Sequence, residues 1–321
     1  MSNFWNEYPD IKNELEIVKN IMKENVKSAH KDMEKALLDL IDSGGKMIRP
    51  AFVLLSGRFG EFDGDKLYSL AAIVEMLHMA TLVHDDIVDD ARLRRGSPTI
   101  QSKYGKDYAV FMGDFLFAKC FMLLSNNTSM ESIKGVAKVV SKICLGEIEQ
   151  FSSRFTPNLS VKKYLKRIGA KTAALFSLSC YIGASESGLD EKQCKSLAKV
   201  GYYIGMAFQI IDDILDYNGN QGSVGKPIGN DLKQGIFTLP LIYALRRDNN
   251  TLSKILCKND YSEEDIKKVV EITRKSNGIE EARRLAKKYT DKAFKQISAL
   301  PDNESRKIFM DVAKRLLNRE Y

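Results

Sequence analysis

The chain has 321 residues, of which 44% are hydrophobic and 28% charged, the composition of an ordinary globular protein with enough material for a large core. Its 49 basic and 42 acidic residues leave a formal net charge of +7. This mild excess suits anionic ligands but is too diffuse to indicate binding of nucleic acid. Five cysteines without a C-x-x-C pair indicate reduced thiols in a cytoplasmic protein and argue against a disulfide scaffold.

The beginning of the chain, MSNFWNEYPDIKNE, is polar and acidic, so it does not have the pattern of a signal peptide. No apolar run reaches the ~18 residues of a membrane span. We therefore expect a soluble, cytoplasmic protein with at most peripheral contact to a membrane.

Apolar residues recur three and four positions apart along most of the chain, which is the spacing of amphipathic helices. The pattern runs over residues 11–41, breaks at DSGGKMIRP (residues 42–50), and resumes over 50–60, 65–90, 109–125, 131–150, 160–184 and 191–217. The glycine-rich residues 218–235 form the longest predicted loop, and a basic helical tail follows from about residue 262. Strand patterns are almost absent, and no shift in composition marks a boundary. We predict one all-α domain, residues 1–321, with ten or more helices.

Two acidic motifs of the form D-D-x-x-D lie inside apolar helical segments. Their aspartates are Asp85, Asp86 and Asp89 in the first motif and Asp212, Asp213 and Asp216 in the second. Residues four apart share a helix face, so each motif projects a pair of carboxylates. Such carboxylates are costly to bury unless they meet cations, and oxygen ligands suit Mg²⁺ bridged to phosphate. One motif alone is more typical of a solvated acidic patch, whereas two predict a Mg²⁺ site across a helical cavity.

Basic residues stand beside glycines near both acidic motifs. They are Lys46 and Arg49 in GGKMIRP, Arg94 and Arg95 after the first motif, and Lys226 and Lys233 around the loop after the second. Taken singly, each is more typical of a solvated surface charge. Together, next to flexible backbone and a carboxylate–metal site, they favour a polyphosphate ligand.

Several segments occur in an order typical of one family: GGKMIRP, HDDIVDDARLRRGSPT, GDFLFA, GEIEQ, KTAALF, and FQIIDDILD followed by GKPIGNDLKQGIFTLPLIYAL. On these motifs, from about Ser43 to Leu245, the chain resembles the trans-isoprenyl (polyprenyl) diphosphate synthases, in particular medium- and long-chain members of the heptaprenyl or hexaprenyl type. The resemblance implies the isoprenoid synthase fold, a helical bundle around a central cavity, and normally a homodimer. It also implies condensation of isopentenyl diphosphate with an allylic diphosphate. Arg92 and Ile236 depart from residues common in relatives, but neither is a predicted site residue.

The resemblance implies roles for individual residues. The expected metal is three Mg²⁺ ions per site, with Mn²⁺ as a substitute. These ions would be held by Asp85, Asp89 and Asp212, supported by Asp86, Asp213 and Asp216. The allylic diphosphate would be bound by Arg94, Lys171, Lys226 and Lys233. Isopentenyl diphosphate would be bound by Lys46, Arg49, His78 and Arg95, with Phe208 near the isopentenyl group. Thr172 and Gln209 would lie near the developing carbocation. We expect His84 to pack against its neighbours, because carboxylates already suffice for a hard cation.

Two small residues, Ala80 and Thr81, stand five and four positions before Asp85. They lie below the predicted metal site on the same helix, which recedes by ~1.5 Å per residue. A growing hydrocarbon chain would descend along that helix, where relatives with short products often have a bulky aromatic residue. The two residues therefore predict an all-trans product longer than twenty carbons, unless Phe117 or Phe121 forms a floor elsewhere.

Other classes of protein fit the sequence less completely. A class I terpene cyclase shares the metal-assisted ionisation but usually has a different second motif and needs no isopentenyl site. A non-catalytic regulatory subunit tends to lose its aspartates, and a metal-buffering or scaffold protein leaves the basic residues unexplained. A catalytic large subunit that requires a small helper chain stays open beside the homodimer.

Overall fold

The computed structural model describes residues 3–94, 96–157, 160–218, 229–248, 250–258 and 260–317. These residues are predominantly helical, which confirms the predicted all-α class. The chain divides into two units. Unit 1 contains Met1–Val136, Leu178–Ala198 and Pro301–Arg306, and unit 2 contains Ala137–Ser177, Lys199–Leu300 and Lys307–Tyr321.

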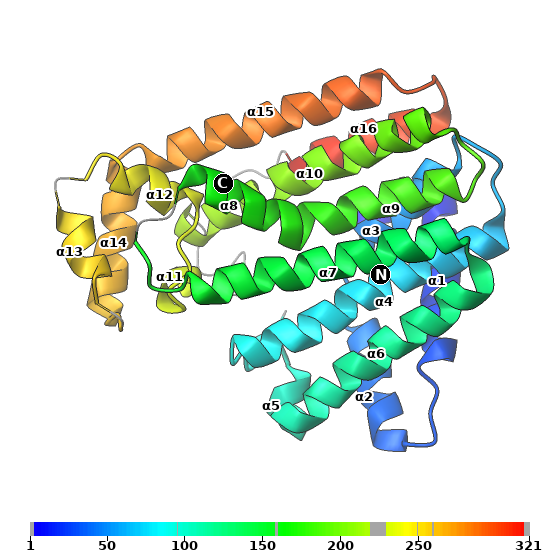
Figure 1. Cartoon of the computed structure of the whole chain (residues 1–321), viewed down its shortest axis with the longest axis horizontal. Helices are drawn as coiled ribbons and strands as arrows, with labels where there is room; N and C mark the ends of the chain where they lie inside the picture. Colours follow the sequence, from blue (N-terminus) through cyan, green and yellow to red (C-terminus); the bar gives the residue numbers. More distant parts are fainter. Residues whose placement is uncertain are drawn as a thin grey trace. The chain divides into compact units, whose positions relative to one another are not determined.

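The elements of each unit are labelled in Figure 1. Unit 1 contains the 3-10 turn η1 (Asn3–Trp5), α1 (Pro9–Asn25), α2 (Lys31–Asp42), α3 (Ile48–Gly57), α4 (Gly64–Val88), β1 (Leu93–Arg94), β2 (Ser97–Pro98), α5 (Ile100–Tyr104) and α6 (Lys106–Asn127). Four helices contribute residues to both units: α7 (Met130–Ser152), α9 (Ala174–Ser185), α10 (Glu191–Asn218) and α16 (Glu304–Leu317). Unit 2 adds α8 (Val161–Ile168), the π-helical turn η2 (Gly169–Ala173), α11 (Asn230–Lys233), α12 (Leu239–Leu245), α13 (Thr251–Leu256), α14 (Glu263–Lys275) and α15 (Gly278–Ser298).

The helical pattern over residues 11–41 corresponds to two helices, α1 and α2. Val26 ends α1 four residues after Met22, and both side chains are buried. The apolar spacing therefore continues through the break and hides it. The backbone N–H of Ser28 donates to the carboxylate of Glu34, a local hydrogen bond that competes with continuation of the helix.

Helix α4 forms the centre of unit 1, with α6 running alongside it (Figure 1) and α3 and α1 also packed against it. Its side chains at Leu67 and from Leu70 to Val74 are fully buried. By length and composition, α4 and the stretch Lys106–Asn126 of α6 could each cross a membrane, contrary to our expectation. In α4, 67% of the apolar window is buried within the protein, as in the core helix of a globular domain, whereas in α6 the share is 33%.

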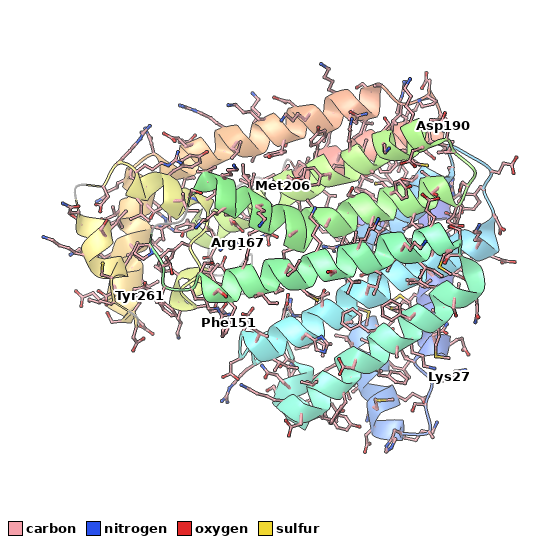
Figure 2. The ribbon with its side chains drawn as sticks, in the orientation of Figure 1. Lys27, Phe151, Arg167, Asp190, Met206 and Tyr261 are labelled. Carbon is pink, nitrogen blue, oxygen red and sulfur yellow. The ribbon has the colours of Figure 1, made fainter. Side chains whose placement is uncertain are left out.

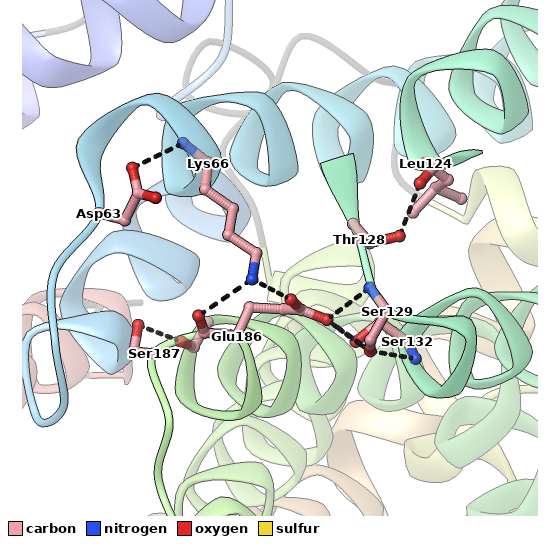
Figure 3. Close-up of polar contacts among 9 residues, drawn as sticks. Asp63, Lys66, Leu124, Thr128, Ser129, Ser132, Glu186 and Ser187 are labelled. Atoms are coloured by element: carbon pink, nitrogen blue, oxygen red, sulfur yellow. Dashed lines mark hydrogen bonds and ion pairs between the residues drawn. The ribbon is translucent and has the colours of Figure 1, made fainter. Parts of the chain in front are cut away.

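A polar cluster holds the first turn of α4 (Figure 3). Lys66 Nζ lies 2.5 Å from Oε2 of Glu186, whose side chain is 3% exposed. The other carboxylate oxygen accepts hydrogen bonds from the hydroxyls of Ser129, at 2.8 Å, and Ser132. Burial opposes ionisation of Glu186, but Lys66 and the hydroxyls outweigh it and hold the pKa of this carboxyl below its usual range. The cluster ties together the starts of α4 and α7 and the end of α9.

In unit 2, α12 packs against α15 and α14. Tyr164 and Tyr217 are among its largest fully buried side chains. Arg274 of α14 donates from Nε to the carbonyl oxygen of Tyr217 at 2.7 Å. This bond satisfies one of the carbonyl groups that the end of α10 leaves without a helical partner.

Candidate active site

The first acidic motif occupies the last turn of α4, in unit 1. Asp85 is half-buried, and Asp89, the residue that ends the helix, donates its backbone N–H to the carbonyl oxygen of Asp85 at 2.9 Å. The two aspartates therefore lie one turn apart on one face. Asp90 follows with a φ of 48°, the left-handed conformation common just after a helix.

Asp86 of this motif and Asp90, which directly follows it, are each paired with a cation of unit 1. Arg94 Nε donates to both carboxylate oxygens of Asp86, at 2.9 and 3.0 Å, and Nη2 lies 2.7 Å from Oδ1. Lys106 lies 2.8 Å from Asp90 and lowers the pKa of that exposed carboxyl. These pairs offset the repulsion among clustered carboxylates. Asp86, predicted to support the metal, is paired with Arg94, which is predicted to bind the allylic diphosphate.

The segment after the motif folds back on the end of α4. Gln101 of α5 donates to the carbonyl oxygens of Asp86 and Ala91, and the Thr99 hydroxyl donates to Ala91 at 2.7 Å. The short β1–β2 hairpin between them pairs Arg94 with Ser97. This local folding fixes Arg94 beside the motif that precedes it.

His84 on α4 packs against residues of α6. Its ring lies 5.7 Å from that of Phe117, and Nε2 is 3.4 Å from Oδ1 of Asp114. A β-carbon on Gly113 would lie only 2.2 Å from the same nitrogen. Glycine in the GDFLFA segment therefore makes room for this histidine, and the contacts agree with the packing role expected for His84.

The predicted isopentenyl diphosphate residues of unit 1 lie on two elements. Arg49 lies in the first turn of α3 and Lys46 two residues before that helix. Trp5 Nε1 donates to the carbonyl oxygen of Lys46, and Lys46 Nζ lies 5.1 Å over the Phe4 ring. His78 lies on α4 and lines a cavity of about 280 Å³. The polar and glycine part of its lining includes Gly44, Gly45, Glu75, His78, Asp86 and Arg94. The cavity thus brings together the glycine loop, His78 and Arg94.

The predicted chain-length residues Ala80 and Thr81 lie on α4, one turn before Asp85. Ala80 is fully buried, and the Thr81 hydroxyl donates to the carbonyl oxygen of His78 at 2.7 Å. Arg95 and Lys226, both predicted to bind diphosphate, lie outside the described residues.

In unit 2, the π-helical turn η2 presents Lys171 and Thr172. Turns of this kind often occur at functional sites. Lys171 Nζ lies 2.8 and 2.9 Å from the two carboxylate oxygens of Glu147 on α7. The sequence reasoning did not single out Glu147; only its place in GEIEQ gives a signal.

A continuous hydrogen-bonded chain links η2, α10 and α8. The Thr172 hydroxyl donates to Oε1 of Gln209 at 2.7 Å, and Gln209 Nε2 donates to Oδ1 of Asp213 at 2.8 Å. Tyr164 donates its hydroxyl to the other oxygen of Asp213 at 2.6 Å. Burial, with repulsion from Asp231, raises the pKa of Asp213 to about 7, although both hydrogen bonds act in the opposite direction. Tyr164 was not among the predicted site residues.

The remaining predicted residues of unit 2 that the structure describes lie on α10 and α11. Asp212 is exposed and Asp216 half-buried, one turn apart on α10. Phe208 packs against Phe176, with ring centroids 5.8 Å apart. Lys233 is exposed in α11.

The donor set of each motif fits a hard divalent cation. Within the described part of the chain, no three His, Cys, Asp or Glu side chains are gathered closely enough to hold a metal by themselves. Each unit instead supplies one pair of carboxylates one turn apart, Asp85 with Asp89 and Asp212 with Asp216. Mg²⁺ commonly binds through one or two carboxylates together with substrate phosphates. Both pairs therefore suit a metal that arrives with a diphosphate.

Comparison with known proteins identifies the family of the chain. The model of the Polyprenyl synthetase family matches residues 30–273, and the chain belongs to that family. It is a prenyl diphosphate synthase, a transferase of prenyl groups.

The chain is similar to "Heptaprenyl diphosphate synthase component 2" of Bacillus subtilis, with 37% identity over 98% of this chain and 90% of that protein. The crystal structure of heptaprenyl diphosphate synthase from Staphylococcus aureus matches with a TM-score of 0.92 and 36% identity, over 97% of this chain and 98% of that one. A polyprenyl synthase from Caulobacter crescentus, complexed with calcium and isoprenyl diphosphate, matches with a TM-score of 0.91 and 32% identity, over 96% and 95% of the two chains.

Proposed function

We propose that the protein condenses isopentenyl diphosphate with an allylic diphosphate, with Mg²⁺ as the metal, to make an all-trans polyprenyl diphosphate longer than twenty carbons. The single observation that carries this proposal is the occurrence of two helical motifs, each with a pair of carboxylates one turn apart. The calcium and isoprenyl diphosphate named for the Caulobacter crescentus relative support the metal and the ligand class. The heptaprenyl relatives and the small, buried Ala80 support the product length.

In this proposal both units form one catalytic domain, residues 1–321. The family match supports it, because it runs from residue 30 to residue 273 and so through both units. Asp85 and Asp89 of unit 1 and Asp212 and Asp216 of unit 2 would then hold metal on the same allylic diphosphate.

The residues of the chain would divide the work as follows. Bound Mg²⁺ supplies Lewis-acid neutralisation of the departing pyrophosphate. Arg94 and Lys171 would hold that pyrophosphate in place, so that it can accept the proton lost on condensation. Lys46, Arg49 and His78 would orient isopentenyl diphosphate with its double bond toward the allylic carbon. Oxygen dipoles of Thr172 and Gln209 would stabilise the carbocation while the buried helices exclude water.

A partner chain would cover the exposed apolar face of α6. Val110, Phe111, Phe121 and Met122 are 39%, 68%, 43% and 60% exposed, a group of large apolar side chains on one helix. The partner is a second copy in the homodimer that we predict, or a helper chain, which the name "component 2" of the Bacillus subtilis relative favours. Mass measurement distinguishes the two, since a homodimer has twice the 36.2 kDa of the chain. Phe111→Asp should prevent either assembly.

The protein would work in the cytoplasm.

The test of the proposed function is an incubation of the purified protein with Mg²⁺, labelled isopentenyl diphosphate and farnesyl or geranylgeranyl diphosphate, followed by sizing of the products. A single long polyprenyl diphosphate is expected. A cyclic hydrocarbon would instead favour a terpene cyclase.

A further inference from the structure

Tyr164 stands at the end of the hydrogen-bonded chain that leads to Thr172. It is fully buried on α8, and its hydroxyl donates to Asp213 at 2.6 Å. Arg167, labelled in Figure 2, lies over its ring with the guanidinium carbon 5.6 Å from the centroid. Nη2 of Arg167 donates to the carbonyl oxygen of Phe237 at 2.9 Å, which holds the arginine in turn. The tyrosine ring is thus fixed by its surroundings as well as by its hydroxyl.

The direction of each hydrogen bond follows from the groups that meet. Tyr164 Oη and Gln209 Nε2 donate to the two carboxyl oxygens of Asp213, one to each. The Gln209 amide therefore turns Nε2 toward Asp213 and Oε1 toward Thr172. Because Oε1 accepts, the Thr172 hydroxyl must donate its only hydrogen to it. The Thr172 hydroxyl hydrogen is then used on Gln209, and the lone pairs of the Thr172 oxygen stay available to a positive charge.

We propose that Tyr164 is a positioning residue for catalysis: by occupying one oxygen of Asp213, it fixes the Gln209 amide and through it the Thr172 hydroxyl. This rests on the proposed function, in which those two groups stabilise the carbocation. Without Tyr164, the carboxylate would lose one of its two anchors and could rotate toward other donors. Gln209 would then sample orientations in which its oxygen no longer faces Thr172.

The kinetic test replaces Tyr164 with Phe and compares it with Tyr181→Phe. Tyr181 also donates to a carboxylate, Glu191 at 3.0 Å, but in an exposed position of unit 1. Loss of one buried hydrogen bond should lower kcat about tenfold in Y164F and leave KM for isopentenyl diphosphate within about twofold. Y181F should match the wild type. Equal kcat in Y164F and wild type would overturn the proposal.

A double variant separates positioning from general destabilisation. If Tyr164 acts through Gln209 on Thr172, Y164F should change kcat less than about twofold in a Thr172→Ala background, because the end of the chain is already lost. Two effects that simply multiply would show that Tyr164 acts independently of Thr172, against the proposal.

A spectroscopic test needs neither metal nor turnover. In the metal-free protein labelled with ¹⁵N-glutamine, the N–H signals of the Gln209 side-chain amide, assigned by their loss in Gln209→Leu, should be protected from exchange with solvent. These signals should shift or broaden in Y164F and not in Y181F. Rapid exchange of the Gln209 amide hydrogens with solvent in the wild type would contradict the proposal, and this measurement does not require a variant to fold. Because this result does not depend on catalysis, it distinguishes failure of the positioning from failure of the proposed function.

Discussion

Gly205 of α10 and Ala173 of η2 approach so closely that a β-carbon on Gly205 would lie 2.7 Å from the Cα of Ala173. The neighbour is backbone, so it cannot turn aside as a flexible side chain would. Gly205 lies one turn before Gln209, and Ala173 follows Thr172. The close approach of the two backbones is therefore what permits the hydrogen bond between Thr172 and Gln209.

Replacement of Gly205 with Ala should separate these two segments. We expect overpacking to lower the free energy of unfolding by about 1–3 kcal/mol. We also expect kcat to fall by about tenfold or more, because the hydrogen bond between Thr172 and Gln209 is lost. Gly135→Ala in α7 is the matched control, since a β-carbon there meets nothing within 4 Å. It should stabilise the protein by roughly 0.5–1 kcal/mol. Denaturant unfolding and steady-state kinetics check both; equal activity of G205A and G135A would contradict the argument.

Asp85 of the first motif and Asp90, just after the motif, should differ sharply in their effect on activity. Asp85→Asn removes a charge from the pair that we expect to hold metal, and kcat should fall by about 100-fold or more. Asp90→Asn removes a charge that is exposed and already paired with Lys106, so activity should stay near wild type. Turnover at several Mg²⁺ concentrations measures the difference. A similar small effect of both substitutions would argue against Asp85 as a ligand.

The buried ion pair of Glu186 and Lys66 should make stability depend on pH. The folded-state pKa of Glu186 lies below the value of 4.5 expected for the unfolded chain, so its contribution is present above pH 4.5 and is lost as the pH falls through the lower folded value. Glu186→Gln should cost about 1–2 kcal/mol at pH 7, and this cost should shrink in acid. Glu191→Gln, at an exposed carboxylate paired with Lys195, should cost much less. A cost for E186Q that is constant from pH 7 to pH 3 would refute the assignment.

Bulk at position 80 should shorten the product. Ala80 is fully buried on α4 below Asp85, so larger side chains there would block a descending hydrocarbon chain. We expect progressively shorter products for Ala80→Val, Ala80→Leu and Ala80→Phe, with overpacking costs of about 1–3 kcal/mol. Chromatography of the dephosphorylated products reads out chain length. An unchanged distribution across the series would show that the floor lies elsewhere.

The long helices and the two acidic motifs could be predicted because their signals are local. The apolar spacing around Asp85 and Asp212 identifies the helices, and the spacing of the aspartates identifies the shared face. The break after α1 could not be seen in this way, because buried Met22 and Val26 continue the pattern across it. Pairings between distant segments were also missed. Glu147 and Lys171 are 24 residues apart, and Tyr164 and Asp213 are 49 apart. Neither Glu147 nor Tyr164 could be identified from its own neighbours in the sequence.

The π-helical turn shows a further limit. Residues 160–184 have continuous helical spacing, and the structure is helical from Val161 to Ser185. The turn Gly169–Ala173 changes the direction of Lys171 and Thr172 without interrupting the helix. A change of one residue per turn leaves almost no trace in an apolar pattern, so the placement of these side chains had to come from the structure.

The central claim is that carboxylates from two acidic helices together hold the cations that release pyrophosphate from an allylic carbon. Its most direct test is incorporation of labelled isopentenyl diphosphate into farnesyl diphosphate, with Mg²⁺ and with EDTA, by the wild-type protein and by the Asp85→Ala/Asp212→Ala variant. We predict long prenyl products from the wild type with Mg²⁺ and none from the variant or with EDTA. Undiminished incorporation by the double variant would contradict the claim.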